Sequence, residues 1–303
     1  MGSAVSDKNM NEIKTLEEFE NEWKEKRPGV IYHYTNIDSC WNILRTSTFR
    51  ASHIMFQNDY SELKEAFDLI EEKLRKIENQ EIKEKILKKI KLMLESAQFP
   101  IYTISFINEN KENESNGSLS QWRGYGDNGA GCRIGINSGD IEYHYTYRKF
   151  NKNCKNQFCN MRKSKVQFCK CIYEEHEKEI FVDALITKLF PQNQKKFIPE
   201  LADDLLNLFL IYAPILKNKA YKDECEWRLV FSNVPEHLVE FDNNKPYVTI
   251  PIYFQGCYEG ILLGPRIVSE FATRKLSYQL IRNNICNSTD GCKISQSTIP
   301  YRG

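Results

Sequence analysis

The spacing of apolar residues changes near Pro100, and this change most limits the folds open to the chain. Before it, residues 60–97 carry an apolar stripe at spacings of three and four, which predicts a pair of helices covering a core. After it, apolar and polar residues alternate with the period of two that β-strands require. The predicted strands lie at residues 101–107, 131–136, 166–173, 227–231, 248–254 and 258–263.

The remaining elements mix helices with strands. We predict helices at residues 11–26, 38–45, 174–216 and 268–283, and strands at 30–34, 49–55 and 293–299. Because the two kinds of element do not alternate strictly, the predicted fold class is α+β. We expect an N-terminal extension over residues 1–29 and one α+β domain over 30–303, with helical insertions at about 60–98 and 174–217.

Charge and hydropathy exclude several classes of protein. The 42 Lys and Arg residues balance 41 Asp and Glu residues, so a polyanionic partner must be argued from a local patch. The longest apolar region, residues 205–216, is interrupted by Asn207 and Pro214, so no membrane partner is expected. The polar N-terminus has no hydrophobic run, which predicts a cytoplasmic protein whose ten cysteines are thiols.

The first candidate for chemistry is the segment Tyr32-His33-Tyr34-Thr35 on an early strand. His33 and Thr35 share one strand face, so they present polar groups on one side while the tyrosines pack on the other. A single histidine on a strand is more often structural than catalytic, and both interpretations stay open.

The second candidate is the segment Asp223-Glu224-Cys225-Glu226-Trp227-Arg228. On a strand Glu224, Glu226 and Arg228 share the face opposite the apolar one. A buried Glu226 needs a partner, and Arg228, two positions away, supplies one. A structural ion pair and a functional site both fit this pattern.

The third candidate is a glycine-rich stretch, residues 118–131. It matches neither the phosphate-binding loop nor the dinucleotide fingerprint. Its glycines would let the backbone approach a ligand closely, although a turn before a strand also explains them. Trp122, Arg123 and Tyr125 beside the glycines indicate a planar or anionic ligand.

The fourth candidate is a basic segment, residues 143–173, with interleaved aromatic residues and no Asp or Glu. Cations that follow phosphates and rings that stack on bases are typical of single-stranded nucleic-acid binding. The candidate contacts are Arg148, Lys149, Lys152, Lys155, Arg162 and Lys163. A solvated loop that balances the acidic residues 174–179 is the alternative.

The same segment contains four cysteines, Cys154, Cys159, Cys169 and Cys171. Their spacing differs from a standard zinc knuckle, and the last two fit one face of a strand. We assign no metal site, and zinc binding by these cysteines stays open.

Four sequence blocks resemble a widespread bacterial family known only as a domain of unknown function. The blocks are Tyr-His-Tyr-Thr with Phe-Gln-Asn-Asp (56–59), Ser105-Phe106 with Leu-Ser-Gln-Trp-Arg-Gly-Tyr-Gly-Asp-Asn-Gly (119–129), Glu-Cys-Glu-Trp-Arg (224–228), and Leu-Gly-Pro (263–265) with a terminal Ile-Pro-Tyr-Arg. The resemblance spans residues 30 to 302 and implies no activity.

Residues 31–44, Ile-Tyr-His-Tyr-Thr-Asn-Ile-Asp followed by Ile43-Leu44, are similar to the opening strand and helix of ADP-ribosyltransferases of the His-Tyr-Glu type. This resemblance implies a mixed, mostly antiparallel sheet core of the ADP-ribosyltransferase-like type with flanking helices. It implies that His33 contacts a ribose of NAD and that Glu226 holds the nicotinamide ribose. The stacking aromatic could be Tyr60, Trp122 or Tyr125, and the middle tyrosine motif of that superfamily is not recognisable here.

The resulting hypothesis is an intracellular ADP-ribosyltransferase with NAD as substrate, acting as a toxin or phage-defence effector on DNA or RNA. Its catalytic residues would be Glu226 and His33, and its NAD-binding residues His33, Tyr34, Thr35, Trp122, Arg123, Tyr125 and Arg228. The acceptor and any antitoxin or defence-system partner stay open. The alternative is a non-enzymatic nucleic-acid-binding or sensor module that uses residues 143–173. A third hypothesis is phosphate transfer to NAD from 2′-phosphorylated RNA.

Overall fold

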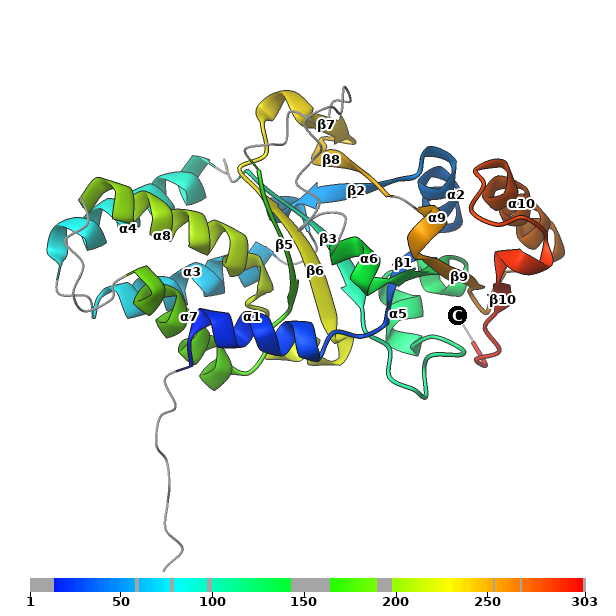
Figure 1. Ribbon diagram of the computed structural model, residues 1–303, viewed down its shortest axis with the longest axis horizontal. Coiled ribbons are helices and arrows are strands. Elements are labelled where there is room, and N and C mark those ends of the chain that lie inside the picture. The colour runs from blue at the N-terminus through cyan, green and yellow to red at the C-terminus, as the bar shows by residue number, and fades with distance from the viewer. Residues whose placement is uncertain are drawn as a thin grey trace, which may run out of the picture.

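A mixed sheet forms the centre of the molecule, and helices gather at its two ends (Figure 1). The computed structural model describes residues 14–57, 60–76, 79–96, 100–142, 164–189, 198–252, 254–267 and 269–301. The fold is α+β, as the sequence predicts, because a sheet with antiparallel neighbours is flanked by helices from several parts of the chain.

The ten strands of the described residues join into one sheet. They are β1 (Val30–Thr35), β2 (Thr48–His53), β3 (Ile101–Ile107), β4 (Cys132–Asn137), β5 (Lys165–Lys170), β6 (Glu226–Ser232), β7 (Val239–Asp242), β8 (Lys245–Pro251), β9 (Tyr258–Leu263) and β10 (Ile294–Gln296). Their order is β10-β9-β4-β1-β3-β2-β8-β7, while β6 pairs with β3 and β5. Among these strand pairs only β9 and β10 run parallel.

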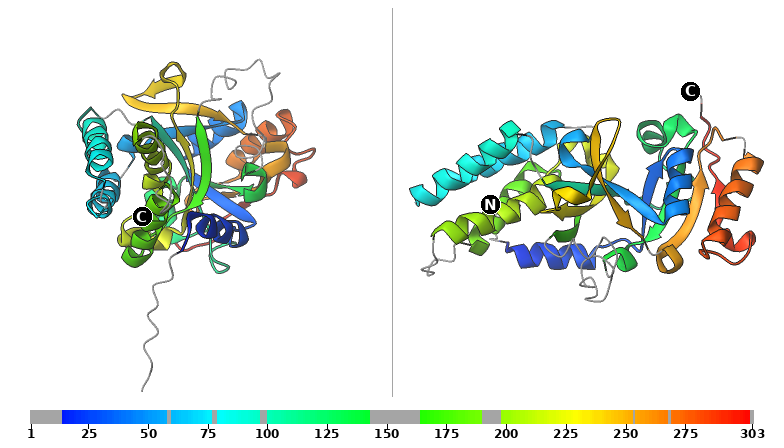
Figure 2. Two further views of the ribbon diagram at one scale, coloured as in Figure 1. Left: turned by 60° about the vertical axis from the view of Figure 1, so that its left-hand side comes forward. Right: turned by 90° about the horizontal axis from the view of Figure 1, so that it is seen from above.

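The helices form two groups. At one end lie α1 (Leu16–Glu25), α3 (Tyr60–Leu74), α4 (Gln80–Ser96), α7 (Glu175–Leu189) and α8 (Ile198–Tyr212); at the other lie α2 (Ile37–Thr46), α9 (Phe254–Cys257) and α10 (Ser269–Arg282). The view from above keeps this separation (Figure 2). Two further helices, α5 (Leu119–Gly124) and α6 (Ser138–Glu142), flank β4 in the sequence.

Strand β3 is the branch point of the sheet. Along one edge it pairs with β6 from Ile101 to Ile107. The pairing with β2 covers Tyr102 and Thr103, and the pairing with β1 covers Ile107. Between these two contacts β1 and β2 diverge, so the sheet opens beside the middle of β3.

Local sequence signals account for several element ends. Thr15 and Glu18 form a capping box at the start of α1. The Asn36 side chain accepts a hydrogen bond from the Ser39 backbone N–H, 2.7 Å away, and so caps α2. These polar groups satisfy donors that the first helical turn leaves unpaired.

Three predictions about elements need correction. The glycine-rich stretch contains a helix, α5, before its turn. The strand predicted to reach residue 254 ends at Pro251, since Phe254 begins α9. The hairpin of β7 and β8 was not predicted, although its turn residues Asn243 and Asn244 both have positive φ, which asparagine tolerates well.

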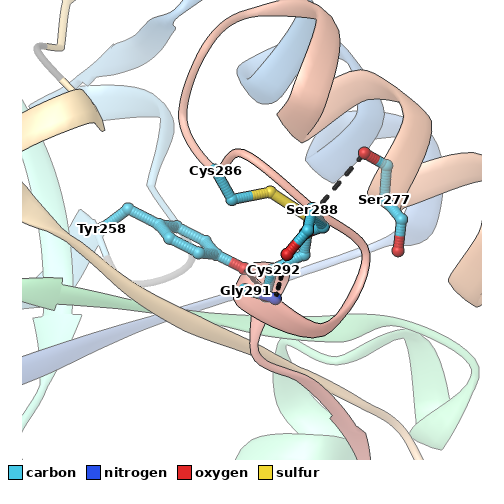
Figure 3. The surroundings of a disulfide bond; sticks show 6 residues. All are labelled: Tyr258, Ser277, Cys286, Ser288, Gly291 and Cys292. Carbon is cyan, nitrogen blue, oxygen red and sulfur yellow. Dashed lines mark hydrogen bonds between the residues drawn. A yellow bond between two sulfur atoms is a disulfide. The ribbon is translucent and has the colours of Figure 1, made fainter.

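The prediction that all ten cysteines are thiols is wrong, because Cys286 and Cys292 form a disulfide. The bond closes the loop between α10 and β10 (Figure 3). In the same loop the Gly291 backbone N–H donates to Ser288 Oγ, 3.2 Å away, and the Tyr258 hydroxyl donates to the Cys292 carbonyl. The covalent bond and these contacts together fix the approach to β10.

Within the part of the chain that the structure describes, no helix combines the length and the apolar character needed to cross a lipid bilayer.

Candidate functional site

A cavity of about 320 Å³ lies where the sheet branches. Strands β1, β2, β3, β6 and β8, helix α5 and the segment before β6 all contribute to its wall. The lining residues are His33, Tyr34, Arg50, Ser52, Phe56, Gln57, Thr103, Ile104, Ser105, Ile107, Gln121, Tyr125, Lys217, Tyr221, Glu224, Glu226, Arg228 and Lys245. Its volume is at the lower end of the range for small-molecule sites, and most of the residues that line it carry a polar group.

His33 lies in the opening between β1 and β2. Its Nδ1 is 3.0 Å from the Ser105 carbonyl oxygen, and its ring packs edge-on against Phe49 and Phe106. Burial lowers the pKa of His33 more than the Ser105 hydrogen bond raises it, so the ring is neutral at pH 7. Because Nδ1–H donates to a carbonyl, Nε2 of the neutral ring is a hydrogen-bond acceptor.

Glu226 lies opposite Ile107 of β3 and is almost completely buried. Its carboxylate accepts from Arg228 Nε at 2.7 Å and Nη2 at 3.1 Å, and from Lys217 Nζ at 2.6 Å. Lys217 Nζ also donates to Glu224 at 2.6 Å. The predicted partnership of Glu226 with Arg228 is therefore confirmed, and Lys217 is a partner that the sequence did not indicate.

Further hydrogen bonds fix the backbone around this ion cluster. The Glu226 backbone N–H donates to the Tyr173 hydroxyl, 2.9 Å away, and Arg228 Nη1 donates to the Pro214 carbonyl. The Lys217 backbone N–H donates to the Ile172 carbonyl at 2.9 Å. The charged groups are thus positioned before any ligand binds.

Burial alone would raise the pKa of Glu226, but the charges and hydrogen bonds of Arg228 and Lys217 outweigh it and lower the pKa to about 2. The carboxylate therefore carries a negative charge at neutral pH. It can stabilise positive charge that develops beside it or accept a hydrogen bond from a hydroxyl group, whereas it cannot serve as a proton donor at pH 7.

This pKa predicts a pH-dependent stability. Because the pKa of about 2 in the folded state lies below the usual 4.5, the stabilisation from Glu226 is complete above pH 4.5 and is lost as pH falls through 2. One titrating group changes the free energy of unfolding by about 1.4 kcal/mol per pH unit. When the pH falls from about 5 to about 3, the free energy of unfolding of wild type should therefore decrease by about 2 kcal/mol more than that of Glu226→Gln. Urea denaturation at a series of pH values measures this difference, and parallel curves for the two proteins would contradict it.

Besides His33, four aromatic residues line the cavity, and they are Tyr34, Phe56, Tyr125 and Tyr221. Tyr125, at the end of α5, is 39% exposed, and its hydroxyl donates to Glu224 at 2.9 Å. Burial, and secondarily Glu224, raises the pKa of Tyr125, so the hydroxyl keeps its proton. Of the three predicted stacking residues, Tyr125 lines the cavity and Trp122 does not. The side chain of Tyr60 lies outside the described residues.

Trp122 does not fit a ligand-binding role. Its ring is fully buried, packs edge-on against Tyr34 at 4.9 Å, and donates from Nε1 to the Asn116 carbonyl at 2.9 Å. It therefore anchors α5 in the core and does not line the cavity. Arg123 and Thr35 are also absent from the cavity lining: Arg123 lies 6.0 Å from the Tyr301 ring, and Thr35 pairs with Cys132.

Two glycines of residues 118–131, Gly126 and Gly131, serve the packing of the chain on itself. A Cβ at Gly131 would lie 2.2 Å from the Thr35 carbonyl oxygen, and one at Gly126 would lie 2.5 Å from the Trp122 ring. Close approach is the predicted reason for such glycines, but their neighbours here are protein atoms rather than a ligand.

Arg148, Lys149, Lys152, Lys155, Arg162 and Lys163 lie outside the described residues, as do Cys154 and Cys159. Cys169 and Cys171 are buried in the core. The described residues include no group of three or more His, Cys, Asp or Glu side chains placed to hold a metal ion.

Sequence analysis missed much of the cavity wall. Lys217 follows an apolar run and shows no motif, and Arg50 and Lys245 come from strands with no charge pattern that sets them apart. Gln121 belongs to the Leu-Ser-Gln-Trp-Arg block, whose pattern indicates no role for it. Only the tertiary arrangement brings these residues beside His33 and Glu226.

Residues 121–229 match the model of a family described as a protein of unknown function, DUF2971. The matched segment includes Gln121, Tyr125, Lys217, Glu226 and Arg228, whereas His33 precedes it. The expected resemblance to a domain of unknown function is thus found over this segment. No curated protein and no solved structure matches the chain.

Proposed function

We propose that the protein is an ADP-ribosyltransferase that binds NAD in the cavity at the branch of the sheet. The observation that carries the proposal is that His33 and Glu226, far apart in the sequence, line the same cavity. These are the two residues that resemble the conserved positions of His-Tyr-Glu type ADP-ribosyltransferases.

The charge of Glu226 suits the chemistry of this reaction. When the bond between the ribose C1′ and the nicotinamide nitrogen breaks, its electron pair goes to the nitrogen, and positive charge develops on the ribose. An ionised carboxylate fixed by Lys217 and Arg228 would stabilise that charge without having to reorganise. The acceptor then forms a new bond to C1′ and loses its proton.

The other lining groups suit the remaining parts of NAD. Nε2 of neutral His33 can accept a hydrogen bond from a ribose hydroxyl. The ring of Tyr125 offers a face for nicotinamide, and the exposed cations Arg50 and Lys245 lie where a pyrophosphate could be held. Because the cavity is about 320 Å³, we expect it to enclose the nicotinamide riboside part and leave the adenylate near the surface.

The acceptor proposed from the sequence is DNA or RNA, presented by the basic residues between 143 and 163. A toxin or phage-defence effector of this kind would modify nucleic acid inside the cell. Arrest of growth on expression, relieved by loss of the Glu226 carboxylate, is the cellular behaviour that such an effector should show.

The proposal is tested by incubating purified protein with NAD labelled on the adenylate in a cell lysate. We expect the label to enter a macromolecule, and digestion with nuclease or protease then identifies the acceptor class. Release of nicotinamide is followed in the same samples. If neither NAD consumption nor label transfer occurs, the enzyme proposal fails, and nucleic-acid binding by residues 143–173 becomes the hypothesis to test.

A further inference from the structure

Gln121 is a buried amide in the cavity wall whose Oε1 has no hydrogen-bond partner among the described residues. The residue is 2% exposed and lies on α5. A buried polar atom without a partner is unfavourable, so each such atom in a native protein needs an explanation, such as a bound water, ion or ligand. Its position beside a cavity indicates that a ligand supplies the missing donor.

Tyr125, the residue that directly follows α5, indicates what kind of ligand this is. Tyr125 lies four residues after Gln121, and its backbone N–H donates to the Gln121 carbonyl at 2.9 Å, so the two residues are one turn apart. Both line the cavity. The pair therefore offers an amide beside an aromatic ring, which complements a planar ring that carries a carboxamide.

We infer that Gln121 determines specificity by binding the carboxamide of nicotinamide, an inference that rests on the proposed function. Gln121 Oε1 would accept from the carboxamide nitrogen, and Nε2 would donate to the carboxamide oxygen. A nicotinate ring has a carboxylate in that place, which has no donor for Oε1 and adds a negative charge beside it. The cavity should therefore discriminate between NAD and its deamidated form, nicotinic acid adenine dinucleotide.

Gln57 provides a matched control because it is a second glutamine of the same cavity. Its Nε2 already donates to Thr103 Oγ1, so its amide is engaged within the protein. Replacing Gln57 by Leu should weaken binding of both dinucleotides alike, whereas replacing Gln121 by Leu should remove the discrimination between them.

The experiment is isothermal titration calorimetry of the full chain with NAD and with nicotinic acid adenine dinucleotide. Wild type should bind NAD at least about 10-fold more tightly, since leaving a buried hydrogen-bonding group unpaired has a large effect on specificity. The ratio of dissociation constants should fall toward one in Gln121→Leu and stay unchanged in Gln57→Leu. Thermal denaturation of each variant verifies that it is folded. A second variant, Gln121→Glu, keeps the shape of the side chain and should still bind nicotinic acid adenine dinucleotide weakly, because its carboxylate repels the carboxylate of nicotinate.

Three results overturn the inference. If wild type binds or consumes NAD but has equal affinity for both dinucleotides, or if Gln121→Leu keeps the full discrimination, the assignment of Gln121 is wrong while the proposed function stands. If wild type binds neither dinucleotide, both the inference and the proposed function fail.

Discussion

Substitution of Glu226 by Gln is expected to lower NAD turnover by at least about 100-fold, because a neutral amide replaces the carboxylate that faces the developing ribose cation. The shape of the side chain is kept, so the loss should fall mainly on kcat rather than on KM. Release of nicotinamide at saturating NAD measures the effect. His33→Ala should also lower turnover, since it removes the ring whose Nε2 is proposed to contact a ribose.

The matched control is Glu240→Gln on the exposed strand β7, which removes one carboxylate away from the cavity. It should leave turnover unchanged. Because Gln at position 226 also weakens the pairing of Arg228, circular dichroism must show that the variant is folded at the assay temperature. A folded Glu226→Gln protein with wild-type turnover would exclude Glu226 from catalysis.

Substitution of Arg228 by Met is expected to destabilise the fold by about 3–5 kcal/mol, the range for breaking a buried ion pair from one side. Arg228 is 4% exposed, and Glu226 is 2% exposed. Without the guanidinium, two carboxylates, those of Glu224 and Glu226, share the single charge of Lys217, and the Pro214 carbonyl loses a donor. Urea denaturation at pH 7 measures the loss.

The double variant Glu226→Leu with Arg228→Met measures how much the interaction between these two side chains contributes to stability. It removes both charges and leaves Lys217 paired with Glu224, so we expect it to be less destabilised than the sum of the two single variants. A coupling free energy near zero would show that the two side chains do not stabilise each other.

These two sets of measurements distinguish a structural ion pair from a catalytic site. A purely structural pair predicts loss of stability in Arg228→Met and normal turnover in any folded Glu226 variant. A catalytic carboxylate predicts loss of turnover in Glu226→Gln at temperatures where the protein stays folded. The sequence left these interpretations open, and burial of the pair alone is consistent with both.

The sequence by itself determined the elements whose pattern is local. The apolar stripe of residues 60–97 predicts α3 and α4, and the alternation at 101–107 and 258–263 predicts β3 and β9 with the observed ends. The pairing of Glu226 with Arg228 was also predictable, because residues two apart on a strand share a face. In each case the interacting residues are neighbours along one element.

Only the tertiary structure decided which strands pair and which residues meet at the cavity. The pairing of β3 with β1, β2 and β6 places His33 beside Ser105 and brings Lys217 and Gln121 to the cavity. A strand carries the same hydrophobic period whichever strand it pairs with. Partner choice and the branch of the sheet depend on side-chain packing across the whole core, which no local pattern records.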